Sequence, residues 1–255
     1  MMSHEAPVMV GTAAWNIPAR QAHAFPSEGS HLERYCRRFP AVEINSSFYR
    51  PHRPGTYRRW AATVPAHFRF AVKVPKEITH LRRLADVDEP LERFLGEAGS
   101  LGEKLGPLLV QLPPGFAFDG RRVSAFLERL RGRTQGDVAC EPRHRSWFTA
   151  EAERLLAGFR IARVAADPAV VPAAAEPGGW PGLAYHRLHG SPRMYHSPYA
   201  LGDLNALGQR LSSSGTAWCI FDNTAEGWAT HDALLLQQAL EPAPRHRQVA
   251  PGAPE

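Results

Sequence analysis

Apolar and polar side chains alternate in eight short segments of the chain. A strand points successive side chains to opposite faces, so this two-residue period predicts strands. The predicted strands are 8–13, 41–48, 68–74, 107–112, 137–143, 160–167, 183–189 and 216–223. Between them, apolar residues recur at helical spacing. The predicted helices are 31–39, 56–64, 90–101, 123–131, 151–159, 201–211 and 225–240, and only the link between the sixth and seventh strands lacks one.

Strands that alternate with helices predict a parallel sheet, and eight such units predict its closure into a TIM-like (β/α)8 barrel. The first strand is not followed by a G-x-G-x-x-G turn, which argues against an open dinucleotide-binding sheet. The length of 255 residues suits one barrel. We therefore expect an α/β protein with a single barrel domain over 1–240 and a flexible tail over 241–255. The Pro- and Gly-rich stretch 167–182 is expected to be a loop.

Several predicted strands carry polar residues on the side opposite their apolar residues. Val42 and Ile44 alternate with Glu43 and Asn45, so the polar pair faces the barrel interior if the apolar pair packs under the helices. The same parity places further polar residues near the C-terminal strand ends, where such barrels build active sites. These residues are Lys73, Gln111, Glu141, Arg143, Arg187 and His189, with Asp167 and Asn223 at the ends of strands six and eight, and with His80 and Tyr195 in the following loops.

The alternative for this polar set is a purely structural group of ion pairs, such as Glu43 with Arg143 or Glu141 with Lys73. Burying charges is costly unless each is paired, and apolar replacements of such pairs are often stabilising. Stability alone is therefore a weak reason to keep so many charges. The pattern favours a ligand site at the C-terminal mouth of the barrel.

Six motifs carry a resemblance to a known family. They are VEINSSFYR, TVPAHFRFAVKVPKEITH, LGEKLGPLLVQLPPGF, ACEPRHRSWF, RLHG followed by Tyr195, and FDN. From Gly11 to about Ala239 the chain resembles the YecE-like family, also called domain of unknown function 72. The resemblance implies a TIM-like barrel and no established reaction.

The chain departs from the family pattern at two places near the mouth. It has Gly11 to Trp15, GTAAW, where the family usually has a GTSGW-like segment. It has Asp222 where the family usually ends a strand with an FNN-like motif. An aspartate at 222 adds a group that only accepts hydrogen bonds, if it faces inward.

Two carboxylates among several cations indicate acid/base chemistry on a small polar or anionic substrate. A glutamate beside Lys or Arg stays ionised and serves as a base, whereas one in an apolar setting keeps its proton and serves as an acid. We predict Glu43, Glu141 and Lys73 as catalytic residues. The predicted substrate-binding residues are Asn45, His80, Gln111, Arg143, Arg187, His189, Tyr195 and Asn223. The cationic side chains would hold a carboxylate or phosphate and stabilise developing negative charge.

A divalent-metal enzyme of the isomerase or endonuclease sort is the first alternative. Its ligands would be Glu43, Glu141, Asp167 and His189, since carboxylates and imidazole suit such ions. Against it, the neighbouring lysine and arginine neutralise the carboxylates and would repel a cation. We expect no resident cofactor, with a divalent metal as the alternative.

The second alternative is a non-catalytic module that binds nucleic acid or protein through an arginine-rich exterior. The net charge is +5, but 27 arginines against three lysines is typical of a GC-rich genome, so the charge does not favour a nucleic-acid partner. Three cysteines without C-x-x-C spacing predict neither disulfides nor a structural zinc site. The chain has no run of about 18 apolar residues and no signal-peptide pattern. We expect a cytoplasmic protein without membrane contact.

Overall fold

The computed structural model describes residues 8–212 and 215–241, so all of the predicted tail except residue 241 lies outside the described residues. The strands are β1 (Met9–Thr12), β2 (Ala41–Ile44), β3 (Arg69–Lys73), β4 (Leu105–Gln111), β5 (Val138–Glu141), β6 (Ile161–Arg163), β7 (Ala165–Asp167), β8 (Gly178–Gly179), β9 (Ala184–Leu188) and β10 (Ala217–Phe221). The α-helices are α1 (His31–Cys36), α2 (Pro54–Thr63), α3 (Asp88–Gly99), α4 (Gly120–Arg131), α5 (Ala150–Gly158), α6 (Leu201–Ser212) and α7 (Trp228–Leu240).

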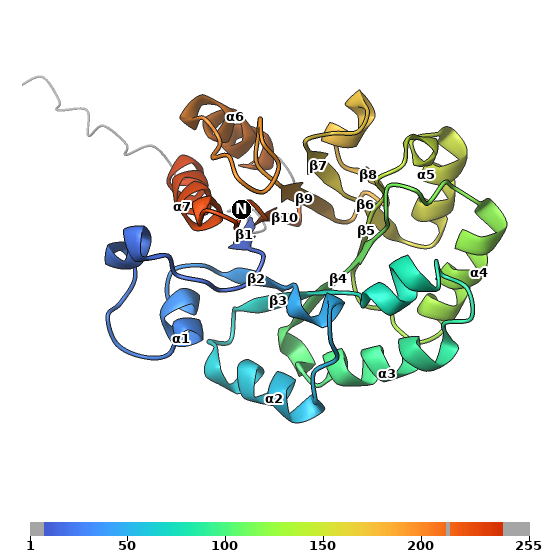
Figure 1. Cartoon of the computed structure of the whole chain (residues 1–255), viewed down its shortest axis with the longest axis horizontal. Coiled ribbons are helices and arrows are strands. Elements are labelled where there is room, and N and C mark those ends of the chain that lie inside the picture. Colours follow the sequence, from blue (N-terminus) through green and yellow to red (C-terminus); the bar gives the residue numbers. More distant parts are fainter. Residues whose placement is uncertain (1–7, 213–214, 242–255) are drawn as a thin grey trace, which may run out of the picture.

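The strands form two sheets that together make a TIM-barrel-like arrangement. One sheet has the order β2-β3-β4-β5-β6-β8 and the other β1-β10-β9-β7. All pairings are parallel except that of the two-residue strand β8. A parallel bridge between Ala13 and Glu43 joins the sheets on one side, and the chain passes directly from β6 to β7 through Val164 on the other. The helices lie outside the strands (Figure 1), which confirms the predicted α/β barrel-like fold.

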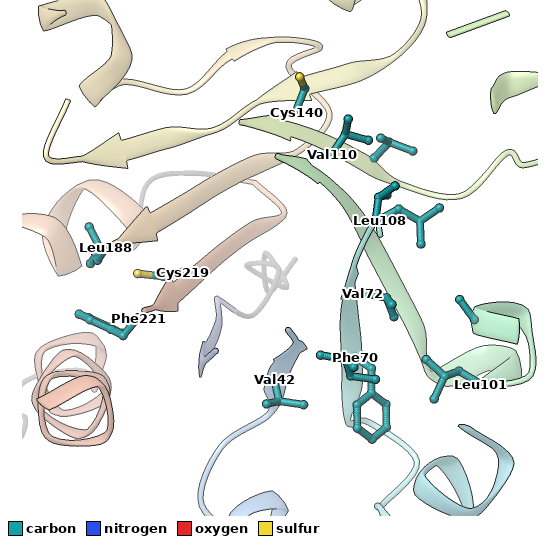
Figure 2. Packing of buried hydrophobic residues seen from close by; sticks show 14 of the residues in the cluster. Val42, Phe70, Val72, Leu101, Leu108, Val110, Cys140, Leu188, Cys219 and Phe221 are labelled. Atoms are coloured by element: carbon teal, nitrogen blue, oxygen red, sulfur yellow. The ribbon is translucent and has the colours of Figure 1, made fainter. Parts of the chain in front are cut away.

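The strand side chains separate into an outer and an inner layer, as the two-residue period predicts. Outer side chains pack against the helices, among them Val42, Val72, Val110 and Cys140 (Figure 2). The inner layer comprises Ala13, Ala41, Ala71, Leu109, Ala139, Ala162, Val164, Leu183, Tyr185, Trp218 and Ile220. Small alanines from one half of the ring thus face large aromatic rings from the other half. This layer fills the barrel beneath the mouth.

Local sequence signals fix where several helices begin. Ser30 and Glu33 form a capping box at the start of α1. Asp119 and Thr149 accept hydrogen bonds from backbone N–H groups in the first turns of α4 and α5. The stretch between β7 and β9 contains only a short 3-10 helix, Pro172–Ala175, and β8. The expected absence of an α-helix from this link is confirmed for the described residues.

The second strand is shorter than predicted. The expectation of a strand over 41–48 is wrong beyond Ile44, because Asn45 adopts a helical backbone (φ −89°, ψ −19°) and a 3-10 turn follows over Ser46–Phe48. The Ser47 hydroxyl lies 3.0 Å from the Ile44 carbonyl oxygen and 2.6 Å from that of Lys73, and so ties this turn to the end of β3. The strand parity therefore does not extend to Asn45.

The three cysteines are free and buried, as expected. Cys140 packs in the outer layer, and burial, followed by the charge of Glu141, raises the pKa of its thiol. Within the described residues, no helix combines the length and apolar composition that crossing a bilayer requires.

Candidate active site at the mouth of the barrel

The C-terminal strand ends bring a group of charged side chains together, because the barrel strands are parallel. Glu43, Lys73 and Glu141 are buried at the ends of β2, β3 and β5. Arg187 and His189 reach the same place from β9 and the residues after it. The side chains joined by hydrogen bonds are Glu43, Glu141, Arg143, Tyr185, Arg187, His189, Tyr195 and Asp222, and we call them the mouth cluster.

Arg187 is the centre of the mouth cluster and is fully buried, at 0% exposure. Its guanidinium donates to both carboxylate oxygens of Glu43, at 3.0 and 2.8 Å. It also donates to Glu141 at 2.6 Å and to Asp222 at 3.1 Å. One planar cation thus binds three carboxylates, a geometry that the fixed fork of an arginine supports and a lysine cannot reproduce.

Glu141 receives hydrogen bonds on both of its carboxylate oxygens. Oε2 accepts from Arg187, while Oε1 lies 2.9 Å from Nε of Arg143 and 3.0 Å from Nε2 of His189. The other ring nitrogen of His189 lies 3.1 Å from Asp222. His189 therefore bridges two carboxylates.

The cations hold Glu141 and Asp222 in their ionised form. Burial alone would raise the pKa of Glu141, but the charges of Arg187 and Arg143 outweigh it and hold this pKa well below its usual range. Burial and Arg187 oppose each other in the same way at Asp222, and the net result is a lowered pKa. Both groups are therefore carboxylates at neutral pH.

Lys73 differs from the other cations because it has no acidic partner. It is 6% exposed, and among the described residues its Nζ makes no hydrogen bond and no ion pair. It lies 4.3 Å from the centroid of the Phe48 ring, in cation–π contact. Burial, followed by repulsion from Arg187, lowers the pKa of Lys73 to about 8, although Glu43 and Glu141 partly offset this. An appreciable fraction of this amine is uncharged near neutral pH.

His80 lies on the loop that follows β3. Its ring contacts the ring of Phe48, the same ring that Lys73 contacts, at a centroid distance of 4.9 Å. Burial, then the charges of Lys73 and Arg143, lower the pKa of His80, so its imidazole is neutral at pH 7. The residue belongs to a single π-helical turn, Glu77–Leu81. Such turns are frequent at functional sites.

Two loops at the mouth carry residues with strained backbone. Arg83, Leu84 and Asp86 have φ of 49°, 68° and 51° in the loop that contains His80, and Tyr195 has φ of 68°. Non-glycine residues in this region cost about 1–3 kcal/mol each and cluster at functional sites. The Tyr195 hydroxyl accepts a hydrogen bond from Nη1 of Arg143 at 3.1 Å. The strained loop thus places a phenol against the mouth cluster.

Other predicted site residues do not join the mouth cluster. Nε2 of Gln111 donates to the Leu112 carbonyl, although β4–β5 pairing places Gln111 beside Glu141. The Asn45 side chain has no hydrogen bond within the described residues, and its buried Oδ1 lacks a partner. The Asn223 amide donates to the Ser197 carbonyl and, at 2.7 Å, to Asp232 of α7.

Asp167 also lies apart from the mouth cluster. Its carboxylate accepts from the Tyr199 hydroxyl at 2.7 Å, and both residues line a separate cavity of about 330 Å³ under α6.

The site residues predicted from the sequence do not include Asp222 and Tyr185. Tyr185 donates to Glu43 at 3.0 Å, and Asp222 contacts two other members of the mouth cluster. Both follow the inward parity, Tyr185 two residues before Arg187 and Asp222 two residues after Ile220. The alternation of β10 therefore contained the signal that places Asp222, rather than Asn223, at the mouth.

The structure does not assemble the predicted metal ligands. Asp167 points elsewhere, and the carboxylates of Glu43 and Glu141 are occupied by guanidinium groups. Among residues 8–212 and 215–241, no three His, Cys, Asp or Glu side chains are arranged to hold a metal ion.

Several exterior arginines pair with neighbouring acids. Arg82 binds Glu77 at 2.8 Å, and Arg129 and Arg133 bind Asp88 at 3.2 and 2.8 Å. These contacts neutralise part of the charge that would attract a polyanion.

Comparison with known proteins identifies the family. A family profile described as "Protein of unknown function DUF72" matches residues 9–255. The chain belongs to the DUF72 family. It is 31% identical over 144 residues to the UPF0759 protein YecE of Escherichia coli (strain K12), and this match covers 55% of this chain and 50% of YecE. It is 32% identical over 126 residues to the UPF0759 protein YunF of Bacillus subtilis (strain 168), and this match covers 46% of this chain and 44% of YunF. The matched stretches thus span about half the length of these relatives.

Solved DUF72 structures share the fold of the whole domain. A crystal structure of a DUF72 family protein from Thermotoga maritima MSB8 has a TM-score of 0.75 and 25% identity, and covers 92% of this chain and 100% of that one. One from Enterococcus faecalis V583 has a TM-score of 0.77 and 21% identity, with 93% and 96% coverage. The resemblance stated from the motifs is confirmed.

Proposed function

We propose that this DUF72 protein is an enzyme that acts on a small anionic molecule at the mouth of its barrel. Lys73 carries the proposal, because it is a buried cation without an acidic partner beside three carboxylates that all have one. An anionic substrate group would supply the missing partner. A lysine whose pKa lies near the working pH is also suited to accept and return a proton.

Arg143 is proposed as the second ligand of the substrate anion. Its side chain is 17% exposed, whereas that of Arg187 is 0% exposed. Its Nε and Nη2 groups donate to Glu141 and its Nη1 group donates to Tyr195, which leaves one N–H of Nη1 without an assigned acceptor. His80 feels the charges of both Lys73 and Arg143 and so lies near both proposed anion ligands.

Glu43 and Glu141 are proposed as positioning residues instead of the acid/base pair expected from sequence. Each carboxylate accepts hydrogen bonds on both oxygens, and neither side chain is more than 1% exposed. Neither has a free oxygen to offer a substrate. Their role in the proposal is to fix Arg187 and Arg143 and to balance a cationic site.

Anion binding tests the proposal. We expect inorganic phosphate to raise the melting temperature of the wild type and to protect Lys73 from acylation. Lys73→Met and Arg143→Gln should each weaken phosphate binding at least tenfold. The matched control is Arg122→Gln. Arg122 lies on α4 with an exposed side chain, 4.0 Å from Asp119, and the variant should bind phosphate as the wild type does.

A turnover screen tests the enzymatic part. Wild type and Lys73→Met would be incubated with a mixture of small carboxylates and phosphate esters, and consumption would be followed by mass spectrometry. Loss of a compound only with wild type supports the proposal. Phosphate binding that is equal in wild type and both mouth variants, with no compound consumed, would refute it.

A further inference from the structure

We propose that the Nζ amine of Lys73 forms a covalent imine with a small anionic aldehyde or ketone, so that the reaction passes through a lysine-bound intermediate. This inference rests on the proposed function and adds the reaction class and the substrate class. It follows from how the mouth cluster leaves one amine unpaired and what surrounds that amine.

The unpaired state of Lys73 is a consequence of the neighbouring guanidinium groups. Glu43, Glu141 and Asp222 are each held by Arg187, and Glu141 is also held by Arg143. Within the described residues, Lys73 forms no ion pair with any carboxylate. A paired ammonium keeps its proton and has no lone pair to share. An unpaired, buried amine loses its proton more readily and becomes a nucleophile.

The charges around Lys73 come from five elements. Arg187 of β9 repels the ammonium, whereas Glu43 of β2, Glu141 of β5 and Asp222 after β10 favour it. His80 of the π-helical turn is neutral, because burial and the charges of Lys73 and Arg143 lower its pKa. The resulting pKa of Lys73, about 8, leaves both protonation states accessible at neutral pH. Imine formation needs the free amine first and a cationic nitrogen afterwards.

The chemical step balances without an external oxidant or reductant. The lone pair of Nζ attacks the carbonyl carbon, and the C=O electron pair moves to oxygen, which takes a proton. The resulting carbinolamine then loses its hydroxyl group as water, so that amine, carbonyl compound and one proton give a protonated imine and one water. Neutral His80 is the nearby group suited to relay these protons.

The mouth stabilises the charge of the protonated imine. The imine nitrogen would occupy the position of Nζ, which lies 4.3 Å from the centroid of the Phe48 ring. The ring face and the three carboxylates all favour a cation there. Unlike the ammonium, the imine carries this charge conjugated to the substrate carbon, where it accepts electrons from an adjacent breaking bond.

The substrate must carry an anionic group beside its carbonyl. His80 lies near both Lys73 and Arg143, whose charges lower its pKa, and Arg143 has one N–H without an assigned acceptor. In the proposal, Arg143 and His80 face the substituent of the carbonyl compound bound at Lys73. A carboxylate or a phosphate matches a guanidinium donor. Two-oxo acids and phosphorylated aldehydes share this chemistry.

Reductive trapping tests the inference on the full chain. The protein would be incubated at pH 8 with glyoxylate, with glycolaldehyde phosphate or with uncharged glycolaldehyde. Sodium cyanoborohydride would reduce any imine to a stable secondary amine, which peptide mass spectrometry would locate. The chain has only three lysines, so exposed Lys76 and half-buried Lys104, which donates to the Pro65 carbonyl, are internal controls.

We expect Lys73 to be labelled at least tenfold faster than either control lysine, with a rate that saturates with the anionic probe and falls below pH 7. Glyoxylate or glycolaldehyde phosphate should react faster than uncharged glycolaldehyde. The faster of the two anionic probes identifies the anionic group of the substrate as a carboxylate or as a phosphate. The variant Lys73→Arg should lose the label while melting cooperatively.

Labelling of Lys73 no faster than Lys76 would overturn the inference. The phosphate-binding measurement then separates the two proposals. Retained phosphate binding that depends on Arg143, without trapping, would leave the anion site standing and remove the imine. Loss of both would remove the proposed function as well.

Discussion

Replacing Lys73 by methionine should make the protein more stable. The pKa of Lys73 falls from 10.5 to about 8 on folding, because burial and Arg187 disfavour its charge. The gap between about 8 and 10.5, at roughly 1.36 kcal/mol for each pH unit, corresponds to about 3 kcal/mol of destabilisation of the folded protein at pH 7. Methionine has a similar length without the charge. It forfeits the cation–π contact with Phe48, worth about 0.5–2 kcal/mol, so the expected net gain is about 1–3 kcal/mol.

The gain should depend on pH in a defined direction. Between pH 8 and 10.5 the unfolded chain keeps the Lys73 proton and the folded protein has lost it, so wild-type stability rises with pH in this window. The destabilisation is fully present below pH 8 and has vanished above pH 10.5. The advantage of Lys73→Met over wild type should therefore shrink as the pH rises through this range.

Urea unfolding at pH 7 and at pH 9.5 provides the measurement. The control is Lys76→Met, an exposed position three residues away, which should change stability by less than about 0.5 kcal/mol. If Lys73→Met proved less stable than wild type by about 1 kcal/mol or more at pH 7, Lys73 would be a structural partner of the carboxylates. Both the free-amine reasoning and the imine would then fail.

Four further outcomes are expected. Glu141→Gln should lower the free energy of unfolding by about 3 kcal/mol in denaturant, because the carboxylate accepts hydrogen bonds from Arg187, Arg143 and His189 and the NH2 group of glutamine cannot accept them. An unchanged denaturant midpoint would contradict these hydrogen bonds. Arg187→Lys should lower stability by about 3–5 kcal/mol in the same assay, since the single ammonium nitrogen of lysine cannot replace a planar guanidinium that contacts three carboxylates. A smaller loss than for Glu141→Gln would show that Arg187 is not the centre of the mouth cluster. Gly11→Ala should abolish folding or sharply lower the melting temperature, because a Cβ there would lie 2.2 Å from the Ala41 carbonyl oxygen, and wild-type melting would refute the close approach. Phosphate binding at pH 8.5 should take up protons, measured by calorimetry in buffers of different ionisation enthalpy, because a bound anion raises the pKa of Lys73 from about 8; a heat independent of buffer would place the anion elsewhere.

The two-residue period was sufficient to find most of the mouth. Glu43, Lys73, Glu141, Arg187 and His189 were predicted from parity alone, and all five are buried at the strand ends. Parity works there because one face of each strand must meet the helices, which leaves the other face to the interior. It fails where the strand ends. Asn45 already belongs to a turn, which no hydrophobic pattern signals.

The pairing of charges could not be predicted from sequence. The pairs considered for the structural alternative were Glu43 with Arg143 and Glu141 with Lys73, whereas Glu43 binds Arg187 and Glu141 binds both arginines. Parity fixes the face of a side chain, but contact across a barrel depends on its height and on the reach of its side chain. Arg187 enters from β9 and spans the mouth to β2. This reach also decides which cation is left unpaired.

The contrast between the mouth and the exterior supports the proposal that the protein acts through its barrel mouth. Exposed arginines such as Arg82 and Arg133 have acidic partners, although pairing there contributes little to stability. Lys73 is buried, where an unpaired charge costs most, and it lacks such a partner within the described residues. A fold selected for stability alone would place an apolar side chain at this position. The unpaired amine is therefore best explained by a molecule that it binds or bonds to.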